Sequence, residues 1–229
     1  MSAIPIQRIR IWSRLLRLCH WLLAVTVLTL LLSGWTLGND PLPASDSWRD
    51  AHVTTGYLLG LTLVVRIVLL FAGRVPTDRW RDCLPFTRQH WLGMRDMLVF
   101  YASLGRAPLP GYYGHNPLWG PLYLLSFGVL AGAVATGMLL ASADPAQYGL
   151  LTAAPWWLGY TLREWHGVLA LTLGGFAALH IASVFLHDAR GTASEISAMV
   201  NGHKIFLLPH SPQDLARPIR IVRPERTDK

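Results

Sequence analysis

Four histidines lie in apolar stretches of the sequence, and their spacing suits the binding of metal cofactors. His166 and His180 share one such stretch, fourteen residues apart. On a helix this separation is an advance of roughly 21 Å, with both side chains on about the same face. His20 and His52 lie in two further apolar stretches. Imidazole is a strong ligand of haem iron, so two pairs of imidazoles at two depths are what two haems would require.

The elements that must position these histidines are long and apolar. Hydrophobic residues make up 52% of the 229 residues and charged residues 14%, whereas ordinary soluble domains have about 25% charged residues. About twenty apolar residues cross a bilayer as a helix, and the stretches lack the alternation of strands. We therefore expect an all-α integral membrane four-helix bundle with short surface helices. Its expected spans are residues 15–37, 51–71, 118–141 and 162–187.

The basic residues predict the orientation of these spans. Four arginines precede the first span or lie at its start, six lie between the second and third spans, and seven Lys or Arg residues follow the fourth. The other two connections contain only two arginines beside five acidic residues. Because Lys and Arg favour the cytoplasmic side, we expect a multi-pass protein of the bacterial inner membrane with both termini in the cytoplasm. The net charge of +7 is explained in this way, and we expect no nucleic-acid partner.

This orientation sorts the histidines by depth. His52 and His166 lie toward the periplasm and form an outer pair, whereas His20 and His180 lie toward the cytoplasm and form an inner pair. We expect each pair to bind one haem b. Ligation by two histidines leaves no open position on iron, so such haems carry electrons. A zinc site is the main alternative, but zinc needs its ligands together, and these pairs are roughly 20 Å apart along the helices.

Other residues at the two depths are candidates for contact with the haems. Gly34 follows the histidine of the first span by fourteen residues, and its lack of a side chain would leave room for the outer haem or serve helix packing. Arg66 follows the histidine of the second span by fourteen residues. It would pair with a propionate of the inner haem or extend to the interface, and Arg14 and Arg17 are further candidates for the inner haem. The glycines of the third span favour helix packing: Gly128, Gly132 and Gly137.

A polar segment precedes the third span on the predicted cytoplasmic side. Residues 78–113 contain a helical pattern of apolar side chains that indicates a short amphipathic helix, lying on the membrane or on a partner subunit. Asn116 before Pro117 is typical of a helix N-cap. As an alternative, His115 or Asn116 would donate a hydrogen bond to a quinone carbonyl. We expect the remaining histidines to face solvent or headgroups: His90, His187, His203 and His210.

Two further segments complete the expected organisation. Residues 147–160 are apolar and aromatic, which predicts a loop or half-helix resting on the outer membrane surface. Residues 1–208 form the transmembrane domain in this interpretation. The basic, proline-containing tail at 209–229 is expected to be extended and to bind anionic lipid or a partner.

Several motifs resemble those of the bacterial di-haem cytochrome b family of the cytochrome b561 type. They are Arg17-Leu18-Cys19-His20-Trp21, Gly114-His115-Asn116-Pro117-Leu118, the pair His166 and His180, and Met199-Val200-Asn201-Gly202-His203-Lys204. The family includes membrane subunits of nickel–iron hydrogenases and formate dehydrogenases. The resemblance implies a four-helix core, two b haems with the ligand pairs given above, and a quinone pocket near Asn116.

The resemblance also implies electron exchange between a periplasmic redox partner and the quinone pool. That partner would be a hydrogenase, a dehydrogenase or a c-type cytochrome, and the sequence contains no recognisable docking segment that selects one of them. An electron-transfer subunit is favoured over a stand-alone enzyme. The alternatives are a self-sufficient quinol oxidoreductase acting on a small oxidant such as superoxide, and a membrane anchor or transporter without haem. The sequence leaves the oligomeric state open.

Overall fold

The computed structural model describes residues 6–39, 46–142, 156–190 and 195–207. Four long helices dominate the described chain: α1 (Arg14–Asn39), α2 (Asp46–Ala72), α4 (Trp119–Ser142) and α5 (Trp156–Arg190). All four are long and apolar enough to cross a membrane, which confirms the expected all-α membrane fold. The helix α5 begins at Trp156, so the end of the outer segment predicted at 147–160 is helical, and residues 147–155 lie outside the described residues.

The chain forms two compact units, each described here by itself. The first, which we call the four-helix unit, comprises Leu18–Ile67 and Leu125–Ala178. The second, the mixed unit, comprises Met1–Arg17, Val68–Leu124 and Leu179–Lys229. All four long helices, α1, α2, α4 and α5, therefore contribute residues to both units.

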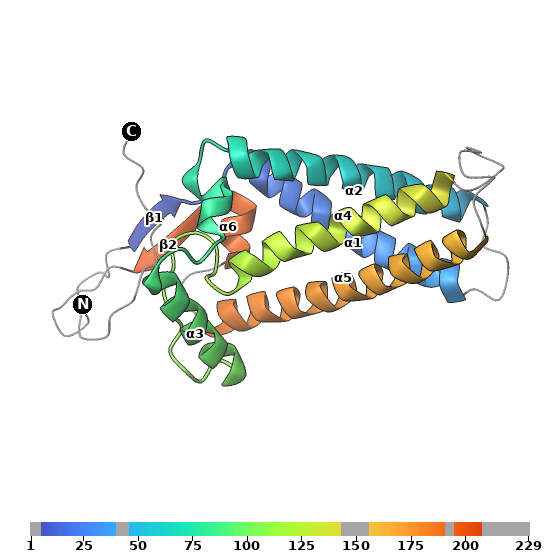
Figure 1. Ribbon diagram of the computed structural model, residues 1–229. Helices are drawn as coiled ribbons and strands as arrows, with labels where there is room; N and C mark the ends of the chain where they lie inside the picture. Colours follow the sequence, from blue (N-terminus) through green and yellow to red (C-terminus); the bar gives the residue numbers. More distant parts are fainter. Residues whose placement is uncertain (1–5, 40–45, 143–155, 191–194, 208–229) are drawn as a thin grey trace. The chain divides into compact units, whose positions relative to one another are not determined.

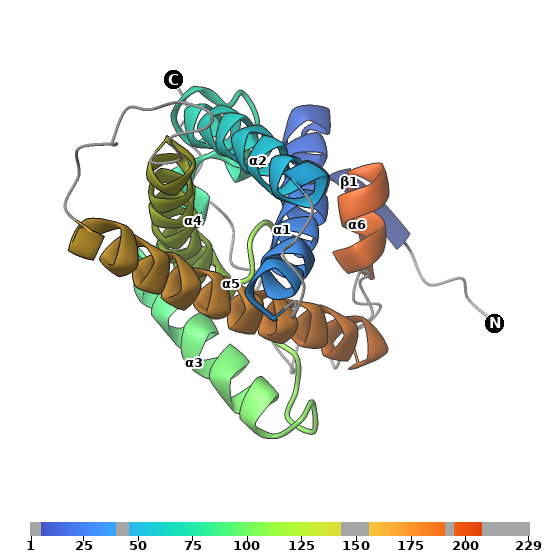
Figure 2. The ribbon, with the colours of Figure 1, turned by 90° about the vertical axis from the view of Figure 1, so that its right-hand side faces the viewer.

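The four-helix unit has an apolar interior to which all four helices contribute. Its buried core consists of Leu59, Leu63, Leu130, Ala133 and Leu173, and leucines of α1 pack against it. In Figure 2 the helices α1, α2 and α4 are foreshortened and α5 runs across the view. Their outer faces expose large apolar side chains, as expected where lipid takes the place of water: Leu32, Leu61, Leu125 and Leu171 are all more than 60% exposed.

Glycines permit close approach between two pairs of these helices. A Cβ atom at Gly60 would lie 3.1 Å from Val134 Cγ1, and one at Gly132 would lie 3.3 Å from Leu169 Cδ1. Both distances are tighter than ordinary side-chain contacts. Gly132 therefore serves helix packing, as expected for the glycines of the third span.

The mixed unit contains a short β ladder that we did not predict. Strand β1 (Ile6–Arg10) pairs antiparallel with β2 (His203–Leu207), and Arg10 is opposite His203. The two strands lie side by side in Figure 1. Gly202 precedes β2 with a φ of 85°, and its carbonyl accepts hydrogen bonds from the backbone N–H groups of Ile11 and Trp12. The helix α6 (Glu195–Asn201) leads into this turn.

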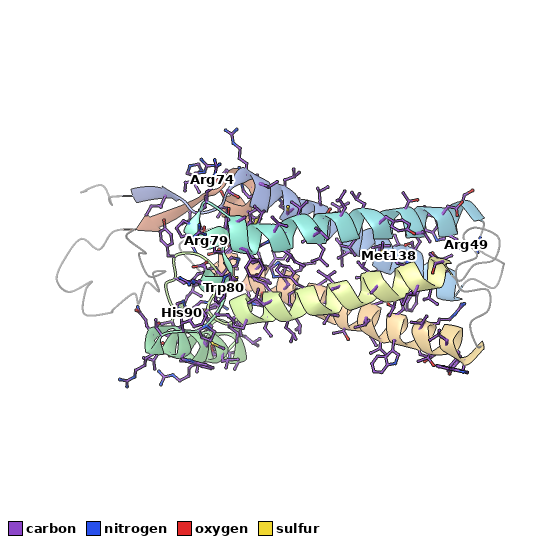
Figure 3. All side chains as sticks on the ribbon, turned by 45° about the horizontal axis from the view of Figure 1, so that its top comes forward. Arg49, Arg74, Arg79, Trp80, His90 and Met138 are labelled. Carbon is purple, nitrogen blue, oxygen red and sulfur yellow. The ribbon has the colours of Figure 1, made fainter. Side chains whose placement is uncertain are left out.

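The segment after α2 consists of short turns with basic and aromatic side chains. It includes the 3-10 helices η1 (Pro76–Asp78) and η2 (Trp80–Asp82). Arg79 donates a 2.6 Å hydrogen bond from Nε to the carbonyl of Gly73. Figure 3 labels Arg79 and Trp80 here.

The amphipathic helix expected within 78–113 is α3 (Arg88–Ala102), which confirms its existence. Thr87 is its N-cap, and the Thr87 hydroxyl accepts from the backbone N–H of His90. The helix buries Met97 and Phe100 in a cluster with Tyr112, while Trp91 on another face is 59% exposed.

Candidate functional site

Two of the four predicted ligand histidines lie close together in the four-helix unit. The ring centres of His52 on α2 and His166 on α5 are 6.4 Å apart, and the rings are inclined at 73°. Two imidazoles that coordinate one metal ion from opposite sides have their centres about 6 Å apart, given metal–nitrogen bonds of about 2 Å. The spacing of the predicted outer pair therefore suits a shared metal ion.

The imidazole of His52 lies against a hydroxyl of α1. The Nδ1 atom of His52 and the hydroxyl of Ser33 are 2.6 Å apart, and the same hydroxyl is 3.3 Å from the carbonyl of Leu30. If His52 binds a metal ion through Nε2, its ring proton is on Nδ1, and the Ser33 hydroxyl is placed to accept it.

His166 has the corresponding contact with α4. Its Nδ1 atom is 3.0 Å from the hydroxyl of Thr136, which donates its own proton to the carbonyl of Gly132 at 2.8 Å. If His166 binds a metal ion through Nε2, the Thr136 hydroxyl is likewise placed to accept from Nδ1–H. Each histidine thus has a hydroxyl of a neighbouring helix at Nδ1, the place where ligand histidines commonly have a hydrogen-bond acceptor.

A glycine follows each of these hydroxyl residues and lies against the same imidazole. A Cβ atom at Gly34 would be 3.4 Å from Cε1 of His52, and one at Gly137 would be 3.0 Å from Cε1 of His166. Gly34 thus lies at the predicted outer pair. Gly137, one of the glycines expected to serve helix packing, lies against His166 of α5. The dipeptides Ser33-Gly34 and Thr136-Gly137 place a hydroxyl and a bare backbone against the two rings, and their matching order was a signal that sequence reasoning missed.

Arg66 is buried within the four-helix unit. The residue is 6% exposed, and its guanidinium carbon lies 5.4 Å from the centre of the Phe127 ring, in cation–π range. A side chain that extended to the interface would expose its head group. The burial of Arg66 therefore favours the interior role among the two alternatives.

The predicted inner histidines belong to different units. His20 lies in the four-helix unit beside the ring of Trp21, at 5.3 Å between ring centres. His180 lies in the mixed unit, where its Nδ1 is 3.4 Å from the hydroxyl of Tyr123 and its ring is 5.5 Å from that of Trp119. The pairing of His20 with His180 stays a prediction.

His115 is part of a buried polar cluster in the mixed unit. One carboxylate oxygen of Asp82 accepts from the His115 backbone N–H at 2.9 Å and lies 2.7 Å from Nδ1. The sulfur of Cys83 is 3.7 Å from the same nitrogen. Burial alone would lower the pKa of His115, but Cys83 and the charge of Asp82 outweigh it and raise the pKa to about 10. The raised pKa favours the protonated form of His115 beside Asp82 at neutral pH.

Asn116 caps the helix that follows it. Its Oδ1 accepts from the backbone N–H groups of Leu118 at 3.0 Å and Trp119 at 3.4 Å, which confirms the N-cap reading. Its Nδ2 donates to the hydroxyl of Tyr101 at 3.0 Å, and the indole of Trp119 donates to the same oxygen at 3.2 Å. Burial raises the pKa of Tyr101, and hydrogen bonds with Trp119, Asn116 and Ser183 partly offset the rise.

His187 corrects one expectation from the sequence. It is 3% exposed rather than solvated, because α5 continues to Arg190 and turns this residue toward the interior. Its Nε2 shares a 2.9 Å hydrogen bond with the hydroxyl of Tyr112. Lys204 lies 3.8 Å above the Tyr112 ring and forms an ion pair with Glu195. Of the other histidines assigned to solvent, two are partly exposed and the last lies outside the described residues: His90, His203 and His210.

Within the described ranges, no group of three or more His, Cys, Asp or Glu side chains is arranged so that it could hold a metal ion. Both cysteines, Cys19 and Cys83, are free thiols.

Known proteins resemble the chain over most of its length. The family model described as prokaryotic cytochrome b561 matches residues 11–202. Among curated proteins, a "Probable Ni/Fe-hydrogenase B-type cytochrome subunit" from Bradyrhizobium diazoefficiens is 29% identical over 207 residues, or 83% of each chain. Proteins with the same description from Cupriavidus necator and Rhizobium leguminosarum bv. viciae are 26% identical over 224 residues and 28% identical over 223 residues. These alignments cover 90% of this chain, and 90% and 92% of the respective relatives. No solved structure matches significantly.

Proposed function

Because the chain belongs to the prokaryotic cytochrome b561 family, we propose that it carries electrons across the bacterial inner membrane through two bis-histidine b haems. The family and the four apolar helices make it a multi-pass bacterial membrane protein with b-type haem and a role in electron transfer. The number of haems, their ligands and the two ends of the electron path are the proposal. The observation that carries it is the pair His52 and His166, each with Nδ1 bonded to a hydroxyl.

His52 and His166 would hold the outer haem. Their spacing and the hydroxyl beside Nδ1 of each ring support this assignment. His20 and His180 would hold the inner haem. The family motifs and the fourteen-residue separation from His166 support that second pair. When bound, each haem supplies a one-electron carrier, and two histidine ligands keep oxygen and substrates from the iron.

The buried charge of Arg66 would stabilise the inner haem. Its guanidinium is retained inside the four-helix unit, beside the Phe127 ring. A propionate would provide a bidentate carboxylate partner. Its position fourteen residues beyond His52 supports this role.

Quinone is the proposed partner at the cytoplasmic end. Asn116, Tyr101 and Trp119 form a hydrogen-bonded group, and the Trp119 ring lies 5.5 Å from the ring of His180. His115 provides a buried proton donor held by Asp82. Reduction of a quinone requires electrons and protons at one place, and these residues offer polar contacts beside a proposed haem ligand.

The proposed partner at the other end is a periplasmic redox protein, and a nickel–iron hydrogenase is favoured. The relatives described as Ni/Fe-hydrogenase B-type cytochrome subunits cover most of this chain. The distribution of Lys and Arg supports an orientation with both termini in the cytoplasm. The outer haem would then lie on the side of the hydrogenase, and electrons would pass from it to the inner haem and on to quinone.

Electron transfer through sealed vesicles tests this function. Purified protein would be reconstituted in liposomes with ferricyanide trapped inside, and dithionite, to which the bilayer is impermeable, added outside. We expect the wild-type protein to reduce the trapped ferricyanide, and His52→Ala and His180→Ala each to stop the reaction. His90→Ala is the matched control, since His90 bonds Thr87 at the start of α3. Wild-type rates in both ligand variants would refute the two-haem path.

A further inference from the structure

Two hydroxyl residues occupy equivalent places around the outer histidines. Ser33 on α1 bonds His52 on α2, nineteen residues away, and Thr136 on α4 bonds His166 on α5, thirty residues away. In each case the contact joins two different helices. The residue after each hydroxyl is a glycine that lies against Cε1 of the same ring: Gly34 against His52, and Gly137 against His166.

Each hydroxyl also contacts a carbonyl of its own helix. Ser33 lies 3.3 Å from the carbonyl of Leu30 and Thr136 lies 2.8 Å from that of Gly132, as is common for Ser and Thr within helices. A histidine that binds iron through Nε2 has its proton on Nδ1, so each hydroxyl can accept from the ligand while it keeps its bond to the helix.

We propose that Ser33 and Thr136 are positioning residues that fix the orientation of His52 and His166 and lower the reduction potential of the outer haem. The inference rests on the proposed function, in which these histidines are the haem ligands. A hydrogen bond from Nδ1–H makes Nε2 a stronger electron donor, which favours ferric iron. Outer-shell partners of this kind tune both the binding and the potential of a metal centre.

The helix backbone lies closer to the His166 ring than to the His52 ring. At Gly137 a Cβ atom would come within 3.0 Å of His166, whereas the corresponding distance from Gly34 to His52 is an ordinary 3.4 Å. The His166 ring is therefore confined between the Thr136 hydroxyl and the backbone of α4. The His52 ring has a shorter hydrogen bond, 2.6 Å against 3.0 Å for His166. Loss of the Ser33 hydroxyl should therefore change the potential more than loss of the Thr136 hydroxyl.

Redox titration with optical detection, together with electron paramagnetic resonance of the oxidised protein, tests this role. The variants are Ser33→Ala and the nearly isosteric Thr136→Val, each compared with the conservative Ser33→Thr and Thr136→Ser. The control is Thr62→Val, because Thr62 is a buried hydroxyl that donates to Leu58 of its own helix. We expect the first two variants to raise the outer-haem potential and shift its low-spin g values. The inner haem, the conservative variants and the control should match the wild-type protein.

The possible outcomes separate this inference from the function on which it rests. Unchanged potential and g values in both Ser33→Ala and Thr136→Val, with haem bound, would overturn the positioning role and leave the ligand assignment intact. Selective loss of the outer haem in Ser33→Ala or Thr136→Val, with the haem retained in the conservative variants, would support the positioning role. Retention of the outer haem in His52→Ala would instead overturn the ligand assignment itself.

Discussion

The ring centres of His52 and His166 are 6.4 Å apart, although the two residues are more than one hundred positions apart in the sequence. Each has its Nδ1 bonded to a hydroxyl of a third or fourth helix. All four long helices thus contribute to one site.

Adding a methyl group at Gly137 should disturb the outer haem more than adding one at Gly34. The Cβ atom of Gly137→Ala would lie 3.0 Å from His166 and force the ring to move by a few tenths of an ångström, whereas Gly34→Ala meets His52 at 3.4 Å. We expect a broadened outer-haem α-band and reduced haem occupancy in Gly137→Ala. Difference spectra per mole of protein measure this effect. Gly128→Ala is the matched control on the same helix, since no atom lies within 4 Å of its Cβ position. Equal spectra for Gly137→Ala and Gly128→Ala would contradict the account.

The ion pair between Asp82 and His115 should stabilise the fold in a pH-dependent way. Both side chains are less than 10% exposed, and removing one partner of a buried pair costs roughly 3–5 kcal/mol. The pKa of His115 is raised from 6.5 to about 10, so the stabilisation is complete below pH 6.5 and is lost as the pH rises through about 10. The charged or titratable groups around His115 are Asp82, Cys83 and Tyr123.

Thermal unfolding in detergent, followed by tryptophan fluorescence, measures this difference. We expect Asp82→Asn to unfold at a much lower temperature than the wild-type protein near neutral pH, and the gap to narrow above a pH of about 10. Asp96→Asn is the control, because Asp96 bonds the exposed Arg95 on α3, and exposed pairs contribute little. A gap that stays constant from neutral to strongly alkaline pH would show that the charge on His115 is not the source of the stability.

Substitutions of Asn116 can separate its capping role from a role toward quinone. Asn116→Asp keeps the oxygen that caps the helix but loses the Nδ2 donor to Tyr101. Asn116→Ala loses both and should cost about 1 kcal/mol in stability. We expect Asn116→Asp to melt like the wild-type protein and to reduce quinone roughly fivefold more slowly, the effect of about one hydrogen bond. Stopped-flow oxidation of the haems by a soluble quinone measures the rate. If both variants reduce quinone at the wild-type rate, Asn116 serves only as the helix cap.

The burial of Arg66 leads to a prediction for the inner haem. Removing a cation near a haem disfavours the reduced form, which carries one more negative charge. Arg66→Met keeps much of the apolar contact with Phe127 and should lower the inner-haem potential, whereas Arg66→Lys should lower it less. Redox titration resolves the two haems. A shift confined to the outer haem, or none at all, would be incompatible with a propionate partner at the inner haem.

The sequence predicts the features that depend on local pattern. The four spans follow from hydropathy, and α3 follows from the helical spacing of residues such as Met97. The meeting of His52 with His166 follows from depth and topology together. These predictions need no knowledge of how the side chains pack.

Features that depend on the register between helices could not be predicted from the sequence. The bonds from His52 to Ser33 and from His166 to Thr136 require the rotation of each helix about its axis, which hydropathy does not fix. The β ladder between Ile6–Arg10 and His203–Leu207 joins the two ends of the chain without a hairpin signal. The burial of His187 depends on the extension of α5 to Arg190.

The most direct test of the central claim is the haem content of three variants: His52→Ala, His166→Ala and the double variant. If the two residues ligate one haem, each single variant loses the same outer b-type band and keeps the inner one, and the double variant loses no more than either single variant. Dithionite-reduced minus oxidised spectra, with haem extracted and counted per mole of protein, give the answer. Loss of different bands in the two single variants, or loss of both haems only in the double variant, would contradict a shared haem.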